Sequence, residues 1–201
     1  VRDGAVVGPT GTDKAPHKTV KDTEHLSEQL CIQCHNATAV ITPTLACTFE
    51  TADEWLAGPY SKEGKNCKTC HMPDTMREAS PGYGVRLGHF HGFPGSGIRK
   101  YADKPTNMLN ALDIFPSEVS ANYNSSDSAN FSMKLVNQHA GHRFPTGDPE
   151  RFIIIEFIVQ AENGDTLGVG SHRIGEKWEW YPEAKKLSDN NMEPLEERDY
   201  N

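Results

Sequence analysis

Four of the five cysteines lie in two copies of one pattern, in which a pair of cysteines is followed at once by a histidine. The copies are Cys31-Ile32-Gln33-Cys34-His35 and Cys67-Lys68-Thr69-Cys70-His71. Two cysteines at this spacing can form thioethers with the two vinyl groups of one porphyrin, and the histidine then lies where it can bind the iron. Zinc sites and redox disulfides also use paired cysteines, but they do not require this histidine. The pattern therefore predicts two covalently attached haem c groups.

The role of each residue in the two copies follows from this chemistry. The predicted cofactor-binding residues are Cys31, Cys34, His35, Cys67, Cys70 and His71, with the two histidines as proximal iron ligands. The fifth cysteine, Cys47, has no histidine after it. We expect it to be an unpaired thiol in the protein interior, with a third haem held by one thioether as the alternative.

Each iron has a second axial position, and seven histidines remain to fill it. His142 lies in Gly-His-Arg-Phe-Pro-Thr-Gly and His91 in His-Gly-Phe-Pro-Gly. A phenylalanine can pack on a porphyrin, while proline and glycine let the backbone turn close to it. We therefore expect His142 and His91 to be distal ligands, followed by His25, which precedes the first haem motif. The alternatives are a turn-holding role for His142 and methionine ligation by Met76, Met108 or Met133.

The remaining histidines have simpler interpretations. His89 competes with His91, and His139 competes with His142, because each pair is close in the sequence. We expect His17 and His172 to be surface residues.

The chain contains few apolar residues and carries a net negative charge. Only 36% of the 201 residues are hydrophobic and the mean hydropathy is −0.63, so a core built from side chains alone would be thin. Two apolar haem plates would add packing surface. The net charge is −8 and no block of Lys and Arg is present, which argues against nucleic-acid binding and favours a basic redox partner.

The sequence also bears on location. The longest apolar run, 152–159, is interrupted by Glu156 and is too short to span a membrane. The first residue is Val1 rather than Met, so we expect a processed chain or a piece of a longer one. Haem c is assembled outside the cytoplasm in bacteria and archaea, which predicts an extracytoplasmic location, in the periplasm or on the cell surface.

The first half of the chain shows helical signals around the two motifs. Leu26, Leu30 and Cys34 recur at helical spacing, and a helix is expected from Thr51, with a capping box to Glu54 and an end near Gly58. Other stretches appear irregular. These are 36–49, and 73–104, which is rich in Gly and Pro and is expected to wrap haem as a long loop. Another short helix is expected from Pro105-Thr106, with Met108, Leu109 and Leu112 on one side.

The second half has the alternation of β-strands. Phe131, Met133 and Leu135 alternate with polar residues, and 151–161 is β-branched and aromatic. Asn163-Gly164 predicts a hairpin turn, with 166–171 as the returning strand. The expected fold class is thus α+β. Its N-terminal region of short helices and loops wraps haem, and a small antiparallel β-sandwich follows. The expected domains are an extended arm at 1–20, a dihaem cytochrome c region at 21–115 and an antiparallel β domain at 116–201.

Several of these stretches resemble a known family. The run from Cys31 through Cys47, Glu54-Trp55 and Ser61 to Cys67–Pro73 is similar to the multihaem cytochromes of the cytochrome c-554 type. The stretch Asn137–Gly147 is similar to a motif that opens an immunoglobulin-like β domain in such proteins. The resemblance spans about Leu26 to about Leu187. It implies electron transfer through closely spaced bis-histidine haems, and it implies ligand roles for His142 and His91. Relatives commonly carry four or more haems, whereas this chain has two motifs.

Two function classes remain open from the sequence. The first is an electron-transfer protein, not an enzyme, working with redox partner proteins or other haem subunits, and assembling as a homo-oligomer or filament. The second is a small reductase or peroxidase in which one haem keeps an open site, with Arg143 or Arg99-Lys100 supplying charge. A docking role for the β domain is a third possibility. The sequence does not select the electron donor or acceptor.

Overall fold

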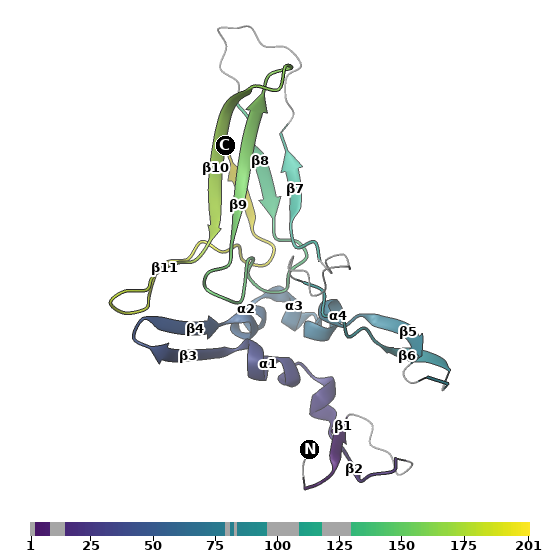
Figure 1. Cartoon of the computed structure of the whole chain (residues 1–201). Helices are drawn as coiled ribbons and strands as arrows, with labels where there is room; N and C mark the ends of the chain where they lie inside the picture. The colour runs from purple at the N-terminus through teal and green to yellow at the C-terminus, as the bar shows by residue number, and fades with distance from the viewer. Residues whose placement is uncertain (1–2, 9–14, 79–80, 83, 96–108, 118–129) are drawn as a thin grey trace. The chain divides into compact units, whose positions relative to one another are not determined.

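The computed structural model of this chain describes residues 3–8, 15–78, 81–82, 84–95, 109–117 and 130–201 (Figure 1). These residues contain thirteen strands, four short α-helices and one 3-10 helix. The predicted helix at Pro105-Thr106, and the Arg99-Lys100 pair, lie outside the described residues.

The chain divides into two compact units, and each unit takes in two separate stretches of sequence. Unit 1 contains Val1–Asn36 and Tyr60–Leu109, and unit 2 contains Ala37–Pro59 and Asn110–Asn201. Both haem motifs therefore belong to unit 1. The stretch between them belongs mostly to unit 2, together with the C-terminal half of the chain.

Unit 1 combines short helices with two small β-ladders. Its elements are β1 (Val6–Gly8), β2 (Thr19–Lys21), η1 (Thr23–Leu26), α1 (Gln29–His35), α4 (Cys67–His71), β5 (Asp74–Glu78) and β6 (Val85–His89). The helix α3 (Pro59–Lys62) begins at the boundary between the units. The side chain of Asp22 caps η1, and that of Asn66 caps α4, so both helical starts are specified locally.

The stretch 73–104 is not the featureless loop that we expected. Its first part forms an antiparallel hairpin of β5 and β6, with Asp74 opposite His89 and Glu78 opposite Val85. The high Gly and Pro content predicted a loop. Each strand has only five residues, which is too short for its alternation of apolar and polar residues to be recognised. The arm at 1–20 likewise contains β1, which pairs with β2 in parallel.

Unit 2 begins with a second unexpected hairpin. The strands β3 (Ala37–Thr42) and β4 (Leu45–Phe49) pair antiparallel across the stretch predicted to be irregular. Pro43 lies in the turn, where it removes no ladder hydrogen bond, and the β-branched run before it suits a strand. The helix α2 (Thr51–Ala57) follows and ends at Gly58, which confirms the predicted helix from Thr51 to near Gly58. Cys47 lies on β4 as a free, half-buried cysteine.

The hydrophobic core of unit 2 lies between a hairpin and a three-stranded sheet. The remaining strands are β7 (Asp113–Pro116), β8 (Met133–Val136), β9 (Phe152–Gln160), β10 (Thr166–Gly175), β11 (Lys177–Glu179), β12 (Lys185–Ser188) and β13 (Glu197–Tyr200). The sheet has the order β13-β8-β7, and β9 pairs with β10 (Figure 1). Side chains from both form one buried cluster, which consists of Leu135, Ile155, Ile174, Met192 and Tyr200.

The predicted fold class is wrong. The described residues are mostly strands and loops, with strands also in the region expected to hold short helices and loops, and they form no closed sandwich. A closed sandwich is absent because each sheet contains only two or three described strands. The layer formed by β9 and β10 has only two strands, and neither pairs with another described strand, so its outer face stays exposed at Ile154, Ile158 and Val169.

The long hairpin itself was predicted correctly. β9 and β10 pair antiparallel around Asn163-Gly164, and Gly164 has a φ of +90°, as such turns require. The returning strand runs four residues beyond the predicted end at Ser171 and stops at Gly175. A Cβ at Gly175 would lie 2.8 Å from the carbonyl oxygen of Arg151 and 2.7 Å from Cβ of Phe152, so only glycine fits there.

Candidate functional site

Both haem motifs lie on the short helices α1 and α4 of unit 1, and the two are built alike. In each motif the first cysteine, Cys31 or Cys67, is half-buried, and the second, Cys34 or Cys70, is exposed. Neither helix contains a buried residue. The second thiol of each pair is therefore open to a cofactor that arrives from outside the helix.

The two motifs meet through their first cysteines. The side chains of Cys31 and Cys67 are hydrogen-bonded to each other, although the residues are far apart in the sequence. Burial raises the pKa of Cys67 to about 11, and the neighbouring Cys31 thiol adds to this effect. Before thioethers form, Cys67 is thus a neutral thiol at physiological pH. The interaction places one predicted attachment cysteine of each motif beside the other.

His71, the predicted proximal histidine of the second motif, is fixed by a hydrogen bond from its ring to a backbone carbonyl. Nδ1 of His71 lies 2.6 Å from the carbonyl oxygen of Pro94. A carbonyl can only accept, so Nδ1 carries the proton and donates it, which leaves the lone pair on Nε2. A histidine in this tautomer, with its second nitrogen engaged by a backbone carbonyl, is prepared to bind a metal through Nε2.

The other predicted ligands of unit 1 lie in simpler surroundings. His35 and His91 are exposed, and the His91 ring lies 6.3 Å from that of Phe93 at an angle of 38°. His25 lies in η1. Among the described residues, no three His, Cys, Asp or Glu side chains gather as they would around a metal ion.

Three further histidines are engaged by oxygen atoms. His89 Nδ1 lies 3.0 Å from Asp74 Oδ1, and His139 Nε2 lies 3.0 Å from Asp113 Oδ1. His172 Nε2 lies 3.1 Å from the carbonyl oxygen of Asn201. Each of these contacts engages one of the two ring nitrogens of His89, His139 or His172.

His142 belongs to unit 2 and has the same tautomer as His71. Its Nδ1 lies 2.8 Å from the carbonyl oxygen of Arg143, so Nδ1 donates and Nε2 keeps its lone pair. The backbone at His142 is fixed by Asn137, whose amide nitrogen donates to the carbonyls of His142, at 3.1 Å, and Met192, at 3.0 Å. Asn137 is completely buried. The sequence reasoning assigned it no role, because nothing local distinguishes an asparagine at the end of an apolar strand.

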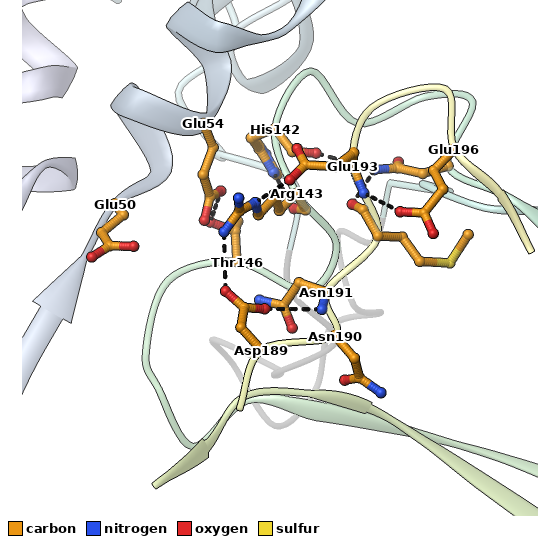
Figure 2. A network of polar contacts seen from close by, with 12 residues as sticks. Glu50, Glu54, His142, Arg143, Thr146, Asp189, Asn190, Asn191, Glu193 and Glu196 are labelled. Atoms are coloured by element: carbon orange, nitrogen blue, oxygen red, sulfur yellow. Dashed lines mark hydrogen bonds and ion pairs between the residues drawn. The ribbon is translucent and has the colours of Figure 1, made fainter. Parts of the chain in front are cut away.

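The neighbouring arginine anchors the same loop (Figure 2). Nε of Arg143 lies 2.7 Å from Oε1 of Glu193, and its terminal nitrogen lies 3.0 Å from Oδ2 of Asp189. Both carboxylates come from the segment after β12. The guanidinium is therefore already paired, which leaves it less suited to the catalytic role considered from the sequence.

Thr146 connects this loop to α2. Its hydroxyl lies 2.6 Å from Oε2 of Glu54, to which it donates (Figure 2). The Thr51 hydroxyl lies 2.8 Å from the same oxygen of Thr146. The predicted capping box is therefore wrong, because Thr51 and Glu54 both bond to Thr146 and Glu50 is the cap residue. Burial raises the pKa of Glu54, while the bond from Thr146 opposes the rise.

The described part of unit 1 contains almost no buried residues. Of its described residues only Ala5 and Pro94 are buried, whereas the buried hydrophobic cluster lies entirely in unit 2. A domain of this kind needs another source of apolar contact. Two haems attached at α1 and α4 would provide it, so the residues present fit the group that the motifs predict.

Comparison with known proteins does not identify a relative: no family model, no curated protein and no solved structure matches this chain. In the described part of the chain, no helix has the length and apolar character needed to cross a membrane.

Proposed function

We propose that this chain is an electron-transfer protein of the c-type cytochrome class, with two haems bound covalently. One haem is attached to Cys31 and Cys34 and the other to Cys67 and Cys70. The observation that carries the proposal is the arrangement of the two cysteine motifs within unit 1. The first cysteines of the two attachment motifs lie next to each other, in a unit with almost no buried side chains among its described residues.

The haem iron, when bound, supplies the one-electron chemistry. The chain supplies the iron ligands and the electrostatic environment of the haems. His35 and His71 bind on the proximal side, and the distal ligands come from His142, His91 and His25. Two histidines on each iron leave no position for a substrate, which favours electron transfer over catalysis. Histidine pairs also give lower potentials than a histidine with a methionine.

The working environment follows from the cofactor and the charge. Covalent haem is attached outside the cytoplasm, so the protein would act in the periplasm or at the cell surface. A net charge of −8 suits a basic redox partner, with long-range attraction that salt weakens. Other haem subunits or further copies of this chain are the alternative partners.

Mass spectrometry of the denatured protein, produced with a haem c maturation system, tests this proposal directly. We expect a mass increase of two haems, and of one haem after Cys67→Ala and Cys70→Ala are combined. Cys47→Ala is the matched control and should retain both. Haem that separates from the chain in acid and organic solvent would show that the attachment is not covalent.

A further inference from the structure

The segment of Phe93, Pro94 and Gly95 lies directly against the ring of His71. The Pro94 carbonyl oxygen is 2.6 Å from Nδ1, and Pro94 is one of the two buried residues in the described part of unit 1. A Cβ placed on Gly95 would lie 3.1 Å from Cε1 and 3.3 Å from Nδ1 of His71. The backbone therefore approaches the imidazole so closely that a side chain at position 95 would displace the ring or the backbone by a few tenths of an ångström.

The backbone conformation of the segment supports this approach. Phe93 has a φ of +44°, which turns the chain sharply before Pro94. Gly95 has a φ of +155°, which L side chains rarely adopt. Proline at 94 restricts the conformations available to the segment. The carbonyl group of Pro94 is thus fixed by the restricted backbone conformations of Phe93 and Gly95 on either side of it.

We propose that Pro94 and Gly95 form a clamp that orients His71 and lowers the reduction potential of the haem attached to Cys67 and Cys70. The inference rests on the proposed function. A donated Nδ1 hydrogen bond makes the imidazole a stronger electron donor through Nε2. A stronger donor stabilises the oxidised iron more than the reduced iron, so the potential falls.

The clamp acts on one haem and not on the other. The ring of His35 is exposed and has no hydrogen-bond partner among the described residues. The haem at Cys31 and Cys34 therefore lacks the equivalent contact from this part of the chain. The clamp makes the two irons electronically different, and its loss would change one midpoint potential alone.

The test is Gly95→Ala, in the protein with both haems attached, followed by spectroelectrochemical titration. The added methyl group must push the His71 ring or the carbonyl away, so we expect one midpoint potential to rise and the other to stay. Gly84→Ala is the matched control. Gly84 lies in the same unit with a φ of +75°, and a Cβ placed on it would have no described atom within 4 Å, so this variant carries the backbone strain without the contact. It should leave both potentials unchanged.

A second measurement uses the unaltered protein and does not depend on the folding of a variant. With ¹⁵N-labelled histidine, the reduced protein should show one proximal Nδ1 proton that exchanges slowly with solvent. Two unchanged potentials in Gly95→Ala, or rapid exchange at both proximal histidines, would overturn the clamp. Because mass spectrometry reports haem attachment independently, either result would leave the proposed function standing.

Discussion

His71 and His142 share a short hydrogen bond from Nδ1, at 2.6 and 2.8 Å, whereas the corresponding contact of the exposed His17 with the Lys18 carbonyl is longer, at 3.3 Å. In both, Nδ1 donates to a backbone carbonyl, of Pro94 or of Arg143, so that Nε2 is left with its lone pair. His139 instead lies against a carboxylate, Asp113. The sequence alone could not distinguish His139 from His142, because they are three residues apart and lie in the same motif.

Replacing His142 tests its role as a distal ligand. If the proposed function holds, we expect His142→Ala to convert one haem from low spin to high spin and to let it bind carbon monoxide, which the unaltered protein, with the two histidine ligands proposed for each iron, should not do. Optical and electron paramagnetic resonance spectra report the change. His139→Ala is the matched control and should stay low spin. Two low-spin haems in His142→Ala would assign the distal ligands elsewhere.

At the scale of elements, Glu54 links α2 to the loop that carries His142, because it accepts hydrogen bonds from the Thr146 hydroxyl and from the backbone of Arg143. Thr146 donates to Glu54 and contacts Thr51, across separations of 92 and 95 residues. Glu54 is half-buried and its pKa is raised by burial, so its carboxylate depends on the remaining hydrogen bonds. The same loop is anchored by Asn137, which directly follows β8, and by the ion pairs of Arg143.

Removing this hydroxyl should loosen unit 2. In Thr146→Val the shape is kept, but the partly buried carboxylate of Glu54 loses one of its donors and keeps the backbone donor of Arg143. We expect a loss of about 1–3 kcal/mol in the free energy of unfolding, measured by urea denaturation. Thr146→Ser keeps the hydroxyl and should lose less than half as much. Equal stability of the Val variant and the unaltered protein would mean that water replaces the bond without cost.

At the scale of the whole molecule, the two units obtain their stability from different sources. Unit 2 has a buried cluster of Leu135, Ile155, Ile174, Met192 and Tyr200, whereas the described part of unit 1 buries only Ala5 and Pro94. Burial of apolar area is the main favourable term in folding. Unit 1 should therefore depend on its haems, and unit 2 should not.

A haem-free variant tests this difference. With Cys31, Cys34, Cys67 and Cys70 all replaced by alanine, we expect fast hydrogen exchange throughout the helices of unit 1. The strands β8, β9 and β10 should remain protected to the same degree as in the haem-loaded protein. Exchange followed by mass spectrometry of peptides resolves the two units. Equal protection of α1 and α4 with and without haem would show that unit 1 folds on its own contacts.

The sequence by itself determined the local features of this protein. The spacing within each haem motif, the helix ending at Gly58 and the turn at Asn163-Gly164 depend on residues that are neighbours in the chain. Periodicity and turn chemistry record such features directly. The same reasoning missed the hairpins β3–β4 and β5–β6, because short strands next to proline and glycine show too few alternations to be recognised.

Only the tertiary structure decided which distant residues meet. Nothing local places the Pro94 carbonyl on His71, the Cys31 thiol on Cys67, or the Thr146 hydroxyl on Glu54. The predicted sandwich failed for the same reason, since strand patterns specify which face is buried but not how many strands share a sheet. Such contacts form when separate segments pack together, and their energies depend on the burial that this packing creates.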